Sequence, residues 1–187
     1  KFWTRDHFKG ANSLGRSINR TRIPIAHKES IRWLENLEQS TRLLANPKQC
    51  IHIGDRESDI YELFCAAEHN KTNFLIRTCV DRLAGDGSSV VSEEISKTKV
   101  KGLHRFTLTN KYGDTENVCL ELKYSTLQLH PPVSKKKHYP ELVLTVIEAR
   151  ERSKPNKGRE PIVWKLLTNL PVRSRSRHPL HPAVHRP

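Results

Sequence analysis

Short apolar runs alternate with polar stretches along this chain, and residues 50–64 (CIHIGDRESDIYELF) combine two such patterns. Ile51 and Ile53 alternate with polar neighbours up to Gly54, which predicts a β-strand followed by a tight turn. The apolar residues of 60–64 then recur at helical spacing. The stretch is therefore predicted to fold as strand, turn and helix, and we expect the rest of the chain to be arranged around it.

Four carboxylates follow this predicted strand, at Asp55, Glu57, Asp59 and Glu62. An aspartate at the carboxyl end of a strand lies at the rim of an α/β sheet, where ligands bind in folds of this class. Magnesium prefers oxygen ligands, usually one or two carboxylates, and leaves room for substrate phosphates. The alternative is that Asp55 or Ser58 caps the helix and that the other acids stabilise its positive end. The residues alone leave both interpretations open.

Two segments extend this unit on either side. An amphipathic helix is predicted within residues 27–44, beginning at Lys28 or Ser30, with Trp33 beside its apolar face and packed in the core. Its apolar positions are Ile31, Leu34, Leu37 and Leu44. Residues 73–78 (NFLIRT) predict a short apolar strand that ends in an arginine. A strand, a helix and a second strand in this order indicate a sheet with helices on it, as in α/β or mixed folds.

The second half of the chain is β-rich. Residues 118–124 alternate between apolar and other side chains, which is typical of a half-buried antiparallel strand. A hairpin connection is predicted at 110–114, where Gly113 suits a turn. Further strands are predicted at Arg105 to Thr109, Leu142 to Arg150 and Ile162 to Thr168.

We therefore expect a mixed α/β fold in four parts. Residues 1–79 form the core, residues 80–160 form a β-rich insertion, residues 161–172 return a strand to the core, and residues 173–187 form a basic tail without fixed structure. The insertion presents basic loops, Arg150 to Arg159 and Pro131 to Tyr139, the second of which holds Lys135, Lys136 and Lys137.

The net charge of the chain limits the classes of binding partner that we expect. The 33 lysines and arginines against 20 aspartates and glutamates give a formal net charge of +13 over 187 residues. This excess favours a polyanion, most often nucleic acid, with an anionic membrane surface as the alternative. No apolar run approaches the roughly 20 residues that span a bilayer, and no amino-terminal stretch has the apolar centre of a signal peptide. We therefore expect a cytoplasmic location, on DNA.

Two features of composition refine this expectation. The chain starts at Lys1 and contains no methionine, so we expect it to be a piece of a longer protein. Its four cysteines form no C-x-x-C pair, which favours small buried hydrophobic residues over disulfides or zinc ligands.

Three motifs, in order, resemble those of the bacterial cut-and-paste DDE transposases, the transposon-five group. IGDRESDI resembles the family's hydrophobic strand followed by Asp-Arg-Glu-x-Asp-Ile, and NFLIRT is similar to a family strand that ends in a DNA-contacting arginine. PIVWKLLTNLPV resembles the Trp-x-Leu-Leu-Thr-x-x-Pro-Val segment. The upstream KESIRWL resembles the family's Lys-Glu-Ser-x-x-Trp-Leu helix start, and the likeness covers about residues 22–172.

The resemblance implies a partial RNase H-like core and a site. Asp55 matches the second carboxylate of the catalytic triad, a ligand of Mg²⁺ or Mn²⁺. Arg77 matches the arginine that touches DNA, and Trp164 matches the tryptophan that stacks on a flipped nucleotide, although an ordinary core tryptophan is the alternative. Arg77 can equally pair with a carboxylate. Glu57 and Asp59 receive no metal role, and Asp59 is expected to cap a helix or to form an ion pair.

The implied activity is hydrolytic nicking of transposon ends, hairpin formation and strand transfer to target DNA. The implied partner is double-stranded DNA, the implied location is the bacterial cytoplasm at the nucleoid, and a homodimer is implied for the intact protein. Two carboxylates of the triad have no match. The first precedes the matched region, and the Tyr-x-x-Arg-x-x-x-Glu-x-x-x-x-x-x-Lys motif of the third does not follow Trp164. We therefore expect an internal transposase fragment that does not cut DNA alone.

Two other functional classes stay open. Gly54-Asp55 and Asp59 also resemble the last motif of haloacid-dehalogenase-type phosphatases, in which both aspartates contribute to magnesium binding. That class needs an upstream Asp-x-Asp nucleophile motif, and Asp6 is the only aspartate before residue 50. The other class is a non-catalytic nucleic-acid-binding module that uses its basic loops alone. Its affinity for nucleic acid would depend on the salt concentration and would not depend on magnesium or on Asp55.

Overall fold

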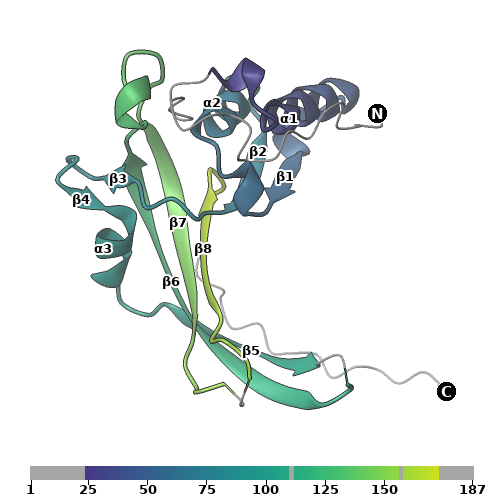
Figure 1. The fold of residues 1–187 in the computed structure, drawn as a ribbon, viewed down its shortest axis with the longest axis vertical. Coiled ribbons are helices and arrows are strands. Elements are labelled where there is room, and N and C mark those ends of the chain that lie inside the picture. Colours follow the sequence, from purple (N-terminus) through teal and green to yellow (C-terminus); the bar gives the residue numbers. More distant parts are fainter. Residues whose placement is uncertain (1–23, 110–111, 156–157, 173–187) are drawn as a thin grey trace, which may run out of the picture.

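One sheet organises the part of the chain that the computed structural model describes, which is residues 24–109, 112–155 and 158–172. The sheet has eight strands in the order β1-β2-β8-β7-β6-β3-β4, with β5 paired to β6 (Figure 1). Only β1 and β2 pair in parallel, and all other neighbours pair antiparallel. The strands are β1 (Ile51–Gly54), β2 (Asn73–Arg77), β3 (Leu83–Ala84), β4 (Ser89–Val90), β5 (Gly102–Thr109), β6 (Thr115–Leu129), β7 (Leu142–Glu151) and β8 (Val163–Thr168).

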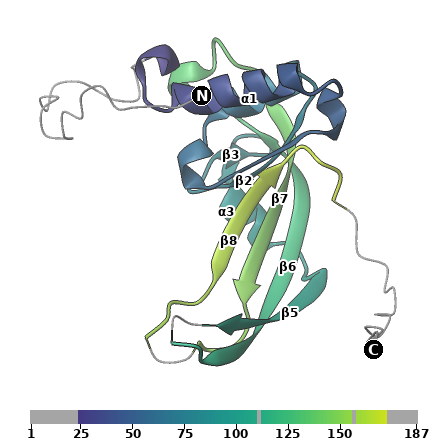
Figure 2. The ribbon, with the colours of Figure 1, turned by 90° about the vertical axis from the view of Figure 1, so that its right-hand side faces the viewer.

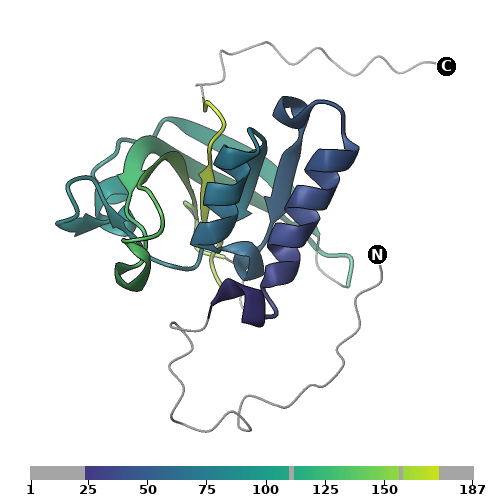
Figure 3. The same ribbon diagram turned by 90° about the horizontal axis from the view of Figure 1, so that it is seen from above.

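The parallel pair is joined by a helix, α2 (Tyr61–His69), to give a βαβ unit. A second helix, α1 (Ile31–Leu43), lies beside α2 on the same face of the sheet (Figure 3). Phe64 of α2 stacks on Phe74 of β2 with ring centroids 4.9 Å apart, and both rings are fully buried. Full burial of such side chains supplies about 1.5 to 3 kcal/mol each, which helps to hold α2 on β2.

The longer strands, β6 and β7, extend the sheet beyond the part that α1 and α2 cover. In Figure 2, β6 and β7 curve from the helical end towards the β5–β6 hairpin at the far end. A short helix, α3 (Val91–Ser96), packs beside β3, β4 and β6. The remaining helical turns are single 3₁₀ turns, named η2 (Ile25–His27), η3 (Pro47–Gln49), η4 (Arg56–Ser58) and η5 (Val133–Lys135).

The sheet has hydrophobic cores on opposite faces at its two ends. Leu129 of β6 pairs with Leu142 of β7, and both belong to the core under the helices. Leu120 of β6 and Ala149 of β7 belong to the second cluster, beside β5. Alternate residues of a strand point to opposite faces. Leu129 and Leu120 are an odd number of positions apart in β6, and so are Leu142 and Ala149 in β7, so the two clusters lie on opposite faces of the sheet.

The structure confirms the mixed α/β class, with one mostly antiparallel sheet and few helices. The predicted strand, turn and helix of residues 50–64 are present, and so are the helix within 27–44 and the strand at 73–78. Trp33 packs against the core as predicted, but Leu44 lies beyond α1 and is exposed. β8 lies between β2 and β7, so the strands of the predicted insertion continue the same sheet as the predicted core.

The exposure of the apolar side chains of β1 was not part of the prediction, and the prediction of buried cysteines needs correction. The apolar residues Ile51 and Ile53 are 50% and 77% exposed, because β1 is an edge strand and α1 and α2 cover only its other face. The four cysteines are free, but none is fully buried and Cys79 is exposed. The basic segment before residue 24 and the tail 173–187 lie outside the described residues. No helix within the described ranges has the length and apolar character needed to cross a membrane.

Candidate functional site

Asp55 follows β1 at the carboxyl end of the strand, and the turn after it holds its main chain in place. The backbone N–H and the hydroxyl of Ser58 both donate to the carbonyl oxygen of Asp55, at 2.9 and 2.6 Å. Gly54 is needed before this turn because a Cβ there would lie 2.0 Å from Oγ of Ser58. The carbonyl group therefore closes η4, and the carboxylate of Asp55 is left 66% exposed.

The helix-capping interpretation of Asp55 and Ser58 is wrong. No side chain caps η4 or α2, and the N-cap of α2 is Ile60. The hydroxyl of Ser58 is turned back to Asp55 rather than towards the amides of the helix. The carboxylate of Asp55 instead accepts a long hydrogen bond, 3.4 Å, from Nη1 of Arg77. The predicted pairing of Arg77 with a carboxylate is thereby confirmed.

Arg77 links Asp55 to Trp164. β2 and β8 pair so that Arg77 lies opposite Leu166, two residues from Trp164 on the same face of β8. The guanidinium carbon of Arg77 lies 5.6 Å from the centre of the Trp164 ring, which is cation–π distance. Trp164 is 42% exposed, so it is no ordinary core tryptophan. The structure thus brings together Asp55 from the turn after β1, Arg77 from β2 and Trp164 from β8; we call them the Asp55 group.

The other carboxylates of the motif are engaged elsewhere. Glu57 pairs with Arg32 of α1 at 2.7 Å. Asp59 forms an ion pair with Arg82 at 2.6 Å, and both side chains are buried. Its second oxygen accepts from the hydroxyl of Thr78 and from the backbone N–H groups of residues 79 and 80. Burial would raise the pKa of Asp59, but the charge and hydrogen bond of Arg82 outweigh burial and hold the pKa below its usual value.

The role of Asp59 follows from these contacts. The predicted ion pair of Asp59 is confirmed, and its carboxylate is committed to holding the loop after β2. A phosphatase of the haloacid-dehalogenase type would need this carboxylate for magnesium, so the arrangement argues against that class. Among the described residues no group of three or more histidine, cysteine, aspartate or glutamate side chains is placed to hold a metal ion. The carboxylate of Asp55 by itself can supply one ligand to a Mg²⁺ or Mn²⁺ ion.

The lysines predicted to bind DNA do not join the Asp55 group. Lys135 forms a close ion pair with the buried Glu62 of α2, whereas Lys136 and Lys137 are exposed. Their loop follows the end of β6, where Leu129 pairs with Leu142. Trp164 pairs with Ala149, seven residues further along β7, which corresponds to about 20 Å. The lysine loop and the Asp55 group are therefore separate surfaces.

Two cations near the Asp55 group were not singled out from the sequence. Arg56 and Lys165 line a pocket of about 220 Å³, together with the backbone turn of residues 78–81 and Arg77. The signals were available, because Arg56 follows Asp55 directly and Lys165 interrupts an otherwise apolar strand. Their meeting was not predictable, because Arg56 of η4 and Lys165 of β8 are 109 positions apart in the sequence.

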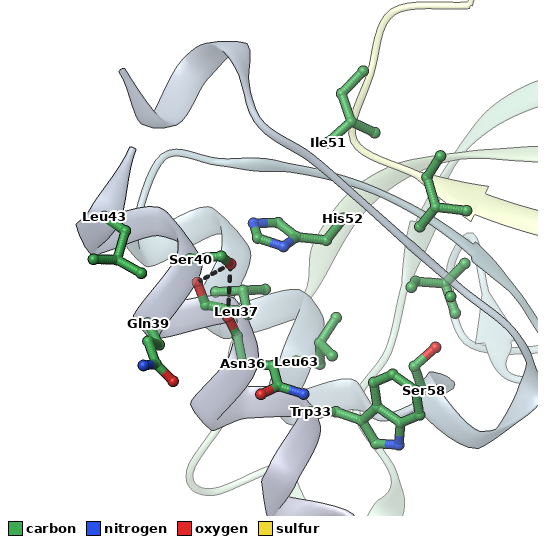
Figure 4. A pocket seen from close by; sticks show the side chains of 13 residues that line it. Trp33, Asn36, Leu37, Gln39, Ser40, Leu43, Ile51, His52, Ser58 and Leu63 are labelled. Carbon is green, nitrogen blue, oxygen red and sulfur yellow. Dashed lines mark hydrogen bonds between the residues drawn. The ribbon is translucent and has the colours of Figure 1, made fainter. Parts of the chain in front are cut away.

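A larger groove of about 570 Å³ separates α1 from the edge of β1 (Figure 4). His52 points from β1 towards α1, and its Nε2 lies within hydrogen-bond distance of the hydroxyls of Thr41 and Thr72. Burial lowers the pKa of His52 and favours its neutral form. The groove is lined mainly by apolar and uncharged polar side chains, so it lacks the charge expected at a phosphate or metal site.

Comparisons with known proteins add no identification, since no protein-family model matches the chain and it matches no curated protein.

Proposed function

We propose that this chain is part of a DNA transposase of the DDE type, with a partial RNase H-like core, and that it binds DNA with the Asp55 group. One observation carries the proposal. Three separate motifs of the resemblance supply Asp55, Arg77 and Trp164, and these side chains form one contiguous, partly exposed surface. The parallel β1-α2-β2 unit beside antiparallel strands agrees with such a core.

Each member of the group has a role that its contacts support. Asp55 is exposed and has one weak partner, so its oxygens can accept a divalent ion. In the intact enzyme, two such ions would stabilise the attacking and leaving oxygens of an in-line displacement at phosphorus. Arg77 orients Asp55 and has further N–H groups for a DNA phosphate. Trp164 offers an exposed aromatic face on which an unpaired base can stack.

The proposal limits what this chain does by itself. One carboxylate holds magnesium weakly and cannot build a two-metal site. We therefore expect the chain to bind duplex DNA, such as transposon ends and target DNA, without cutting it. In the intact bacterial protein the same surface would serve strand cleavage and strand transfer at the nucleoid, in a homodimer.

Metal-dependent DNA binding tests the proposal. Binding to a labelled duplex is measured by fluorescence anisotropy while Mn²⁺ or Mg²⁺ is added at constant ionic strength. The metal should strengthen binding by the wild-type chain and should not strengthen binding by Asp55→Asn. Without metal, Asp55→Asn should bind up to about fivefold more tightly, because a negative charge is removed. Glu57→Gln is the matched control, since Glu57 is exposed beside Asp55 but pairs with Arg32.

The outcomes separate the proposal from the non-catalytic module. If the metal effect is lost in Asp55→Asn and kept in Glu57→Gln, Asp55 is the metal ligand. If binding follows only salt and both variants respond to metal as the wild type does, the chain is a basic binding module. Absence of any duplex binding would contradict both.

A further inference from the structure

The small pocket beside the Asp55 group concentrates positive charge. Arg56 of η4, Arg77 of β2 and Lys165 of β8 line it. Within the described residues, neither Arg56 nor Lys165 has a recorded ion pair with a carboxylate. Some other cations of the described residues, such as Arg32, Arg82, Lys135 and Arg159, each pair with an acid.

The acidic groups around the pocket offset only part of its positive charge: Asp81 belongs to the lining, and Glu148 of β7 lies opposite Lys165 in the sheet. Asp81 lines the pocket, but its carboxylate accepts from the backbone N–H and the hydroxyl of Ser92. The backbone N–H groups of Cys79 and Val80 donate to the buried Asp59. An anion in this pocket would therefore be held by the side chains of Arg56 and Lys165, on a loop that Asp59 keeps in place.

We propose that this pocket binds a phosphate group, either a phosphodiester of the DNA backbone or free inorganic phosphate. Its volume of about 220 Å³ is below the roughly 300 Å³ at which pockets begin to hold drug-sized ligands, and it suits one tetrahedral oxyanion. Arginine and lysine side chains are the usual partners of phosphate. The inference deepens the proposed function and, for a DNA phosphate, rests on it. Arg56 follows Asp55 and Lys165 follows Trp164 in the chain, so the pocket borders the Asp55 group, with Lys165 on the opposite face of β8 from Trp164.

Duplex binding at several salt concentrations tests the DNA form of the proposal. Lys165→Gln and Arg56→Gln should each weaken binding about fivefold at 0.15 M salt and reduce the salt slope by about 1, because each removes one phosphate contact. Lys48→Gln is the matched control, since it removes the same charge from an exposed lysine before the start of β1, at the other end of that strand. It should leave affinity and slope unchanged.

A second arm uses inorganic phosphate without DNA. Phosphate replaces chloride at constant ionic strength, and thermal unfolding is followed. A ligand that binds only the folded chain raises the Tm, so phosphate should raise the Tm of the wild type and of Lys48→Gln but not of Lys165→Gln or Arg56→Gln.

The two arms together decide the proposal. Losses in both arms assign the pocket to phosphate in general, a loss only with DNA assigns it to a phosphodiester, and a loss only with phosphate assigns it to the free ion. If both substitutions match Lys48→Gln in both arms, the pocket proposal is overturned while DNA binding through Asp55 stands. If the chain binds no DNA, the proposed function fails, and the phosphate arm still decides the pocket.

Discussion

The guanidinium of Arg77 lies against the ring of Trp164, with 5.6 Å between its carbon and the ring centre, although 87 positions separate the two residues in the sequence. Arg77 also bonds to Asp55. Phe74 and Ile76 of β2 point to the core under α1 and α2, so Arg77, at the alternate position, points to the opposite face. The Asp55 group therefore occupies the face of the sheet that these helices do not cover.

Trp164→Ala should lower affinity for DNA that contains an unpaired base. Stacking of a base on an aromatic side chain is worth about 1 to 3 kcal/mol, which corresponds to about 5- to 150-fold in affinity. Binding is compared by anisotropy for a duplex with one unpaired base and for the fully paired duplex. Trp164→Phe should keep most of the preference, because a ring remains.

Val143→Ala controls for the loss of an exposed apolar side chain elsewhere on the sheet, since Val143 of β7 is 67% exposed. An unchanged preference in Trp164→Ala would remove Trp164 from the DNA-binding surface.

Asp59→Asn should destabilise the fold at neutral pH. It leaves the buried Arg82 without its partner charge, and breaking a buried pair costs about 3 to 5 kcal/mol. Because the pKa of Asp59 is lower in the folded chain than in the unfolded chain, its contribution is complete above about pH 4 and is lost as the pH falls through the folded pKa. Urea unfolding should therefore show a large difference from wild type at pH 7 and a smaller one in acid.

Glu57→Gln gives the comparison for this experiment, because its pair with Arg32 is exposed and is worth at most about 1 kcal/mol. Equal losses in Asp59→Asn and Glu57→Gln would show that burial of the Asp59 pair adds nothing.

Gly54→Ala should destabilise the turn that presents Asp55. The new Cβ would lie 2.0 Å from Oγ of Ser58 and 2.9 Å from Cδ1 of Ile76, and overpacking of this kind costs about 1 to 3 kcal/mol. Gly102→Ala is the control, since nothing lies within 4 Å of a Cβ there. Thermal unfolding should give a lower Tm for Gly54→Ala and an unchanged or slightly higher one for Gly102→Ala. The reverse order would mean that the close approach at Gly54 is relieved at no cost.

The sequence predicted the elements whose pattern is local. The strand, turn and helix around Gly54 follow from alternation, a glycine and helical spacing within a few residues. The alternation in β6 also predicted a strand at 118–124, but the structure extends it to Leu129. The apolar positions shift from even to odd between Tyr124 and Leu127, because the strand passes from one core to the core on the opposite face.

Contacts between distant segments were less predictable. The exposure of Ile51 and Ile53 depends on β1 being an edge strand, which no local pattern reveals. The pairing of Lys135 with Glu62 joins residues 73 positions apart and removes one lysine from the basic loop. The meeting of Asp55, Arg77 and Trp164 follows from the pairing of β2 with β1 and β8, whereas the resemblance named the residues only one at a time.

Hydrogen exchange of the chain, with and without saturating duplex DNA, tests the central claim most directly because it maps the bound surface. The account predicts slower amide exchange in peptides that span Asp55, Arg77 and Trp164, each at an end of its strand. Peptides of α3, which packs beside β4 at the other edge of the sheet, should not change. Binding that protects other segments and leaves these three peptides unchanged would contradict the assignment of DNA binding to the Asp55 group.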